Sequence, residues 1–195
     1  MRTPPLASGP EGPGALGPLL DTVLDALQQG ARARGGPLPA GGPDAVTERI
    51  REALGDVLPD KGDRHALHVL VRAFAQGAAD PADPRCAAHL HCPPLAVATA
   101  ADLAANVLNP SLDSWDQAPA ATALETLVTG ALAREAGAAD ALVTTGGTES
   151  NQLALLLARE TRGAGLRLVH AENAHHSLGR AAWLLGLPDP VVLPA

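Results

Sequence analysis

Residues 141 to 160, ALVTTGGTESNQLALLLARE, decide how the second half of this chain folds. Four residues suited to a strand, 141–144, precede Gly146 and Gly147, and Thr148 opens a polar helix start followed by leucines at helical spacing. This order can hold a phosphate on backbone N–H groups, because glycine lets the backbone come close and a helix N-terminus has unpaired N–H groups. On these residues alone, a tight turn before a capped helix is the alternative.

The glycine turn differs from the common nucleotide-binding motifs. No Gly-Lys-Ser/Thr follows it, which excludes a Walker loop, and the Gly-x-Gly-x-x-Gly spacing of dinucleotide-binding proteins is missing. The prediction is therefore a phosphate-binding turn in which backbone amides near Gly147 and the hydroxyl of Thr148 are the donors.

Around this turn, apolar runs alternate with helical patterns. Helical spacing occurs in residues 148–161 and 177–187, and residues 166–170 and 191–193 suit further strands. The alternation predicts an α/β fold with a parallel sheet between helices. Three strands and two crossover helices are an incomplete sheet, so we expect the N-terminal part of a larger domain, with apolar surface exposed at its last strand.

The residues before this sheet are predicted to be mainly helical. Apolar residues at helical spacing predict helices near residues 16–30, 46–57, 63–76, 95–108 and 119–136, with Gly30 ending the first and Gly137 stopping the last. Residues 1–13 are rich in Pro and Gly and are expected to be disordered. The predicted division is a tail (1–13), a helical arm (14–79) and an incomplete α/β domain (80–195).

Charge and composition exclude several classes of protein. A net charge of -7 and a pI near 5.4 disfavour nucleic-acid binding and an anionic membrane surface. No apolar run is long enough to span a membrane, and the first residues lack the apolar core of a secretory signal. Cys86 and Cys92 are too few for a disulfide framework, so a reduced, cytoplasmic setting is expected.

Histidines occur at two places where a ligand could bind. His175 and His176 follow a predicted strand and precede a helix, which puts them at the carboxyl edge of the sheet together with the glycine turn. The alternative is helix capping by Asn173 or Ser177 beside exposed histidines. A second group contains His89, His91 and Cys92, whose spacing matches no standard zinc pattern, so no metal is predicted.

Four segments in order resemble the group II pyridoxal-phosphate (PLP) decarboxylases, the relatives of aromatic-amino-acid and glutamate decarboxylase. They are DPRCAAHLHCPP (83–94), NPSLDSWDQAPAATALE (109–125), TTGGTESNQLALLLAR (144–159) and ENAHHSLGRAAWLLGL (172–187). The first two are most similar to the L-2,4-diaminobutyrate decarboxylase branch. The resemblance covers residues 80–195, whereas the arm matches only in being helical.

The resemblance implies the aspartate-aminotransferase fold (fold type I), the cofactor pyridoxal 5'-phosphate and an intertwined homodimer. It implies that Gly147 and Thr148 hold the phosphate, and that His175 stacks on the pyridine ring and assists the chemistry. It also implies that the loop with His89, His91 and Cys92 lines the substrate side, and that residues 115–122 lie near the active site at the dimer interface.

The implied activity is decarboxylation of an amino acid, L-2,4-diaminobutyrate or a related one. Family members bind PLP covalently through a lysine and place an aspartate against the pyridine nitrogen. The only lysine here, Lys61, lies in the helical arm and in none of the four motifs. We therefore expect a truncated decarboxylase; the alternatives are an inactive fragment that acts as a dimerisation module and another fold-type I PLP enzyme.

Overall fold

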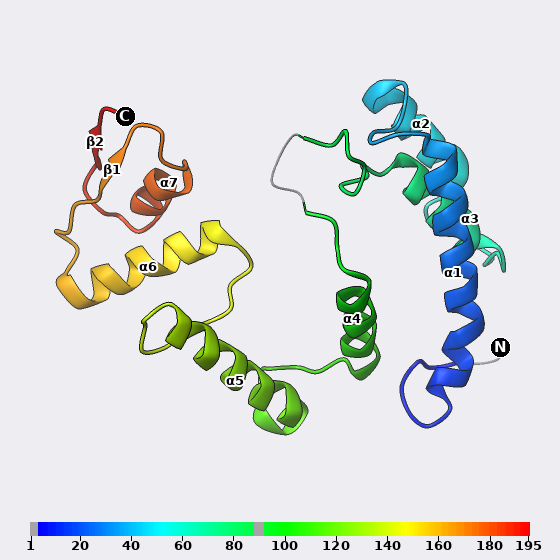
Figure 1. Cartoon of the computed structure of the whole chain (residues 1–195), viewed down its shortest axis with the longest axis horizontal. Helices are drawn as coiled ribbons and strands as arrows, with labels where there is room; N and C mark the ends of the chain where they lie inside the picture. Colours follow the sequence, from blue (N-terminus) through cyan, green and yellow to red (C-terminus); the bar gives the residue numbers. More distant parts are fainter. Residues whose placement is uncertain (1–3, 88–91) are drawn as a thin grey trace. The chain divides into compact units, whose positions relative to one another are not determined.

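A computed structural model describes residues 4–87 and 92–195 of the chain (Figure 1). These residues form two compact units that divide between Ser111 and Leu112. The described elements are α1 (Gly12–Arg34), α2 (Gly42–Leu54), α3 (Ala66–Gly77), α4 (Ala96–Leu108), the 3₁₀ turn η1 (Trp115–Gln117), α5 (Pro119–Glu135), α6 (Gly147–Arg162), β1 (Val169–Ala171), α7 (Ser177–Leu184) and β2 (Val191–Leu193). The predicted boundaries of tail, arm and α/β domain remain predictions.

The helices expected from hydrophobic periodicity are present, and their ends follow the local signals. α5 begins at Pro119, where the missing N–H costs nothing. It stops where Gly137 takes a positive φ of 67°. There the N–H of Gly137 donates to the Arg134 carbonyl at 3.1 Å, and that of Ala138 donates to the Ala133 carbonyl at 2.8 Å. This pair of bonds is a Schellman motif, as the glycine predicted.

Gly30 does not end the first helix, and that prediction was wrong. A Cβ added to Gly30 would lie 2.5 Å from the carbonyl oxygen of Arg72 and 2.6 Å from Cβ of Ala75. The glycine therefore serves close packing of α1 against α3, which run side by side in the first unit (Figure 1). The helix continues past it and is capped by Gly35, whose φ is 73°.

Arg34 ties the end of α1 to the end of α3. Its guanidinium donates to the carbonyl oxygens of Gly36 at 2.8 Å, Ala75 at 3.0 Å and Ala78 at 3.4 Å, and to Oδ2 of Asp80 at 2.6 Å. The Arg34 side chain is only 8% exposed. Because these carbonyls lie in or just past the last turns of two helices, one side chain satisfies groups that neither helix can satisfy internally.

The second unit has its core between α6, α7 and the segments beside them. Leu155 of α6 packs with Ala181 and Ala182 of α7 and with Leu187, and the partly buried leucines at this core are Leu166, Leu168 and Leu185. Alanines on α7 let that short helix lie close to α6. The core thus fixes the start of α7 relative to α6, and both helix starts carry predicted site residues.

β1 and β2 form a parallel pair joined through α7, with Val169 opposite Val191 and Ala171 opposite Leu193. The strand predicted at 191–193 is confirmed, and the one predicted at 166–170 is displaced to residues 169–171. The three residues of β2 are exposed, in agreement with the expected apolar surface.

Residues 141–144 are not a strand, which corrects the sequence-based prediction. Leu142 and Val143 are 62% and 67% exposed. A strand requires hydrogen bonds to a neighbouring strand, and within the described part of the chain the sheet contains β1 and β2 alone. The chain thus has the expected mixture of helices with a small, incomplete sheet, with two described strands instead of three.

Candidate cofactor-binding site

The turn before α6 needs glycine at one position. Gly146 is the N-cap residue, with φ 153° and ψ 174°, a combination that is essentially restricted to glycine. Its carbonyl oxygen accepts hydrogen bonds from the N–H of Ser150 at 3.1 Å and from the hydroxyl of Thr144 at 3.2 Å. The turn is therefore held with its carbonyl directed into the helix.

Glu149 holds the other side of the same turn. Its Oε2 accepts hydrogen bonds from the backbone N–H of Thr145 at 2.6 Å and from the Thr145 hydroxyl at 2.7 Å. These two bonds, the backbone one first, lower the pKa of Glu149 below its ordinary value. The carboxylate satisfies an N–H group in front of the helix, as in a capping box, and fixes the path of residues 145–149.

The first turn of α6 is open to an anion. Helix geometry leaves the N–H groups of Gly147, Thr148 and Glu149 without partners inside the helix. The N-cap residue, Gly146, has no side chain that could cap them. A Cβ added to Gly147 would meet no atom within 4 Å, and Thr148 is exposed. Free N–H groups, a nearby hydroxyl and the helix dipole are the features that bind phosphate.

His175 lies in the turn between β1 and α7 and is exposed. Its Nδ1 lies 2.8 Å from Oγ of Ser177 and accepts a hydrogen bond from the Ser177 N–H at 3.3 Å. The ring of His176 lies against it, with centroids 4.1 Å apart and planes inclined by 35°. The imidazole is thus held at one nitrogen while remaining accessible to a ligand.

Two residues that the sequence analysis did not assign to the site connect its two halves. Nδ2 of Asn151, on the second turn of α6, donates to Oγ of Ser177 at 2.8 Å. The same Oγ bonds to His175, so Asn151, Ser177 and His175 form one hydrogen-bonded network. Neither Asn173 nor Ser177 caps α7, whose N-cap is His176. Instead, Nδ1 of His175 accepts the N–H of Ser177, the first residue of that helix. The sequence signal that could have indicated this contact was the presence of polar side chains at positions 151 and 177, beside an apolar helix face.

The predicted substrate-side loop is described only in part. His89 and His91 lie outside the described residues, and Cys92 is exposed. Just before this loop, Arg85 donates to Asp83 from its guanidinium at 2.8 Å and from its backbone N–H at 2.9 Å. The guanidinium bond and then the backbone bond lower the pKa of Asp83 to about 2. The turn that leads into the loop is therefore held by the Asp83 carboxylate, which stays ionised down to low pH.

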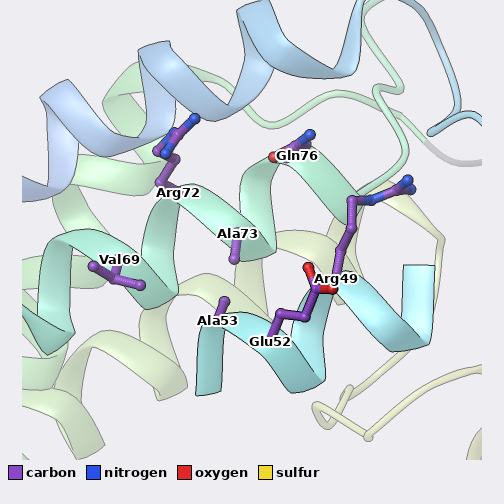
Figure 2. A pocket seen from close by; sticks show the side chains of 7 residues that line it. All are labelled: Arg49, Glu52, Ala53, Val69, Arg72, Ala73 and Gln76. Atoms are coloured by element: carbon purple, nitrogen blue, oxygen red, sulfur yellow. The ribbon is translucent and has the colours of Figure 1, made fainter. Parts of the chain in front are cut away.

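A hollow of about 400 Å³ lies between α2 and α3 in the first unit (Figure 2). Its polar side chains include Arg49, Glu52 and Arg72. None of the residues that the sequence analysis assigned to the cofactor or substrate lines it. Lys61 lies in the turn region between the same two helices.

No described helix is long and apolar enough to cross a membrane, and the described residues contain no cluster of three potential metal ligands.

Comparison with known proteins identifies relatives of the chain. It is 38% identical over 148 residues to L-2,4-diaminobutyrate decarboxylase of Rhizobium meliloti (strain 1021), which covers 71% of this chain and 30% of that protein. It is 33% identical over 102 residues to the protein of the same name in Acinetobacter baumannii, covering 51% and 20%. No family model matches the chain.

Solved structures of similar fold extend over nearly all of the chain. One is the glutamate decarboxylase domain of diaminobutyrate-pyruvate transaminase and L-2,4-diaminobutyrate decarboxylase from Vibrio parahaemolyticus, with a TM-score of 0.81, 25% identity, and coverage of 97% of this chain and 46% of that one. Mouse CSAD has a TM-score of 0.79 at 22% identity, covering 94% and 42%, which supports the fold alone.

The chain spans 30% of the length of the Rhizobium relative. Its fold is that of the PLP decarboxylase domains of fold type I, as the four motifs predicted. The partial coverage fits an N-terminal portion of such proteins. Taken together, these similarities show that the chain belongs to the group II PLP decarboxylase family.

Proposed function

We propose that α6 and the turn before α7 carry the phosphate- and ring-binding half of a PLP site in an amino-acid decarboxylase. The N–H groups of Gly147 and Thr148, with the Thr148 hydroxyl, would hold the phosphate, and His175 would stack on the pyridine ring. The open space at Gly147 fits an anion, and the exposed His175 ring leaves a surface for a planar group.

The observation that carries this proposal is the connection between the two halves. Thr148 and Asn151 are three residues apart on α6 and lie on the same side of it. Asn151 is hydrogen-bonded to Ser177, which is hydrogen-bonded to His175. An anion-binding helix start and an aromatic ring are therefore parts of one connected structure. This supports a single ligand with a phosphate at one end and a flat ring at the other.

When bound, PLP supplies an electron sink for the negative charge left by departing carbon dioxide. The residues of this chain would bind and orient the cofactor for that step. Lys61 lies outside the four motifs and between α2 and α3. In this proposal the lysine that binds PLP and the aspartate against its ring nitrogen belong to a part of the protein other than these 195 residues.

The substrate, assembly and location are further parts of the proposal. The names of two relatives support L-2,4-diaminobutyrate as the substrate, with His89, His91 and Cys92 on its side of the site. A homodimer that contains residues 115–122 at its interface is supported by Trp115, which is 70% exposed. The two free cysteines, Cys86 and Cys92, support a reduced, cytoplasmic setting.

Titration of the 195-residue chain with PLP tests the phosphate contact. Replacing Thr148 by Ala removes a hydroxyl donor to a charged group and should weaken binding by about tenfold. The matched control is Thr161→Ala on the last turn of the same helix, where the exposed hydroxyl bonds the Leu157 carbonyl. Equal affinities for wild-type and Thr148→Ala would contradict the assignment of the phosphate to this turn.

Turnover tests the activity itself. A complete protein that contains this chain should release carbon dioxide from L-2,4-diaminobutyrate faster than from glutamate, and the opposite order would refute the substrate assignment. Because Lys61 is exposed and lies outside the proposed site, the 195-residue chain treated with PLP and borohydride should gain no more adduct at Lys61 than an ordinary surface lysine would. If the complete protein also lacks a covalent adduct and turnover, the inactive dimerisation module becomes the better description.

A further inference from the structure

Ser177 is a polar residue with no exposed surface at the first position of α7. A hydroxyl in such a place must find partners, because an unpaired buried polar group is costly. Its Oγ lies 2.8 Å from Nδ2 of Asn151 and 2.8 Å from Nδ1 of His175. The hydroxyl thus joins a residue of α6 to the exposed imidazole that the proposed function assigns to the cofactor ring.

The direction of these hydrogen bonds follows from the groups involved. The backbone N–H of Ser177 can only donate, and it points to Nδ1 of His175 at 3.3 Å. Nδ1 is therefore an acceptor without a proton. Nδ2 of Asn151 can only donate, so Oγ of Ser177 accepts from it and directs its own proton toward Nδ1. With Nδ1 as the acceptor, this arrangement places the ring proton on Nε2.

We infer that Asn151 and Ser177 are positioning residues that fix His175 as the Nε2–H tautomer and hold its ring plane. This inference rests on the proposed function for its purpose, because a stacking ring must keep one orientation. The tautomer and the ring plane are properties of the chain without the cofactor. The N–H and the hydroxyl of Ser177 both donate to Nδ1 of His175. Nε2–H is then the group with which the ring can donate a hydrogen bond to a ligand.

Nitrogen-15 NMR of the histidine side chains of the 195-residue chain measures the tautomer directly, with His175→Gln used to assign the signal. For the wild type we expect at least about a tenfold excess of Nε2–H over Nδ1–H at His175, as two donors on one nitrogen imply. An equal mixture, or an excess of Nδ1–H, would overturn the inference.

Asn151→Asp is the informative variant, because a carboxylate accepts and does not donate. The proton of Ser177 should turn toward the new carboxylate, and Oγ should then accept from Nδ1, so the tautomer ratio should fall by about tenfold. The matched control is Asn173→Asp, which adds the same charge in the turn that contains His175; Asn173 is exposed, and its side chain makes no hydrogen bond to the described residues. An unchanged ratio in Asn151→Asp, or an equal change in the control, would reject the network.

Ser177→Ala is a second variant that adds no charge and should also lower the ratio, because one of two donors is lost. PLP titration of the same proteins separates the two proposals. A wild type with the Nε2–H tautomer that does not bind PLP would refute the proposed function and leave this inference standing. A wild type that binds PLP with mixed tautomers would refute the inference alone.

Discussion

The first and second units each contain a polar side chain that is withdrawn from water and joins distant segments, but the two hydrogen-bond networks end differently. Arg34 donates to three backbone carbonyls and to Asp80. Ser177 connects Asn151 to His175, which is exposed. The first network closes within the protein, whereas the second ends on a ring that a ligand can reach. A buried network that ends within the protein, like that of Arg34, therefore indicates a structural role. One that ends on an exposed side chain, like that of Ser177, indicates a functional role.

Breaking the closed network should have the largest effect on stability. Arg34→Met removes the partner of Asp80 and leaves carbonyls at two helix ends unpaired, so we expect a loss of about 3 to 5 kcal/mol in the free energy of unfolding of the first unit. Hydrogen exchange of α1 and α3 would measure it. Arg51→Met is the control, because that side chain is 73% exposed. A comparable loss in both variants would show that Arg34 has no special role.

Substitution in the core of the second unit should have the next largest effect on stability. Leu155→Ala removes a side chain that is 9% exposed, and the cavity should cost about 2 to 3 kcal/mol. Leu157→Ala on the same helix is the control, because Leu157 is 60% exposed. Urea unfolding followed by circular dichroism compares the two. If both variants unfold at the same urea concentration, the core assignment is wrong.

The glycine turn should show a smaller effect on stability. Gly146→Ala forces a side chain into the φ 153°, ψ 174° conformation, which costs about 1 to 3 kcal/mol. Gly147→Ala meets no atom within 4 Å and should leave stability nearly unchanged while its methyl group reduces PLP affinity. Thermal unfolding of both variants measures the backbone strain at residue 146, and PLP titration measures how far a methyl group at residue 147 obstructs the ligand. A stable Gly146→Ala variant would contradict the backbone argument.

The smallest effect should come from Glu149 and depend on pH. Because its pKa is lowered in the folded protein, the carboxylate contributes stability above the ordinary glutamate pKa of about 4.3, and this contribution disappears as the pH falls through the lowered value. Glu149→Gln should thus unfold slightly earlier than wild type at pH 7 and coincide with it in acid. Glu160→Gln, at the exposed end of the same helix, is the control. A difference that grows in acid would reverse the sign and reject the assignment.

Much of the fold could be predicted because its signals are local. Helical spacing, Pro119 and Gly137 mark helix positions whatever surrounds them. Gly30 was misread because a glycine inside a helical pattern can mean a helix end or a close helix contact, and only the neighbouring α3 decides. Residues 141–144 were misread because apolar residues suit a strand, but a strand also requires a partner that local sequence does not reveal.

The site was predictable to the extent that each part is a turn next to a helix start. Gly147, Thr148 and His175 were named from their motifs, and their roles toward PLP remain proposals. Asn151 and Ser177 were seen only as helix-start residues, because their contact joins positions 26 residues apart. Hydrogen-bond direction depends on which donor faces which acceptor, and no sequence pattern contains that information.

That short separation also has a consequence for folding. Closing a loop costs an entropy that rises with the logarithm of its length, and contacts between nearby residues favour fast folding. Since Asn151 and Ser177 are 26 residues apart, α6, β1 and α7 can assemble early, as a nearly local event. A nascent chain would thus acquire the start of α6 and the hydrogen-bonded imidazole of His175 together.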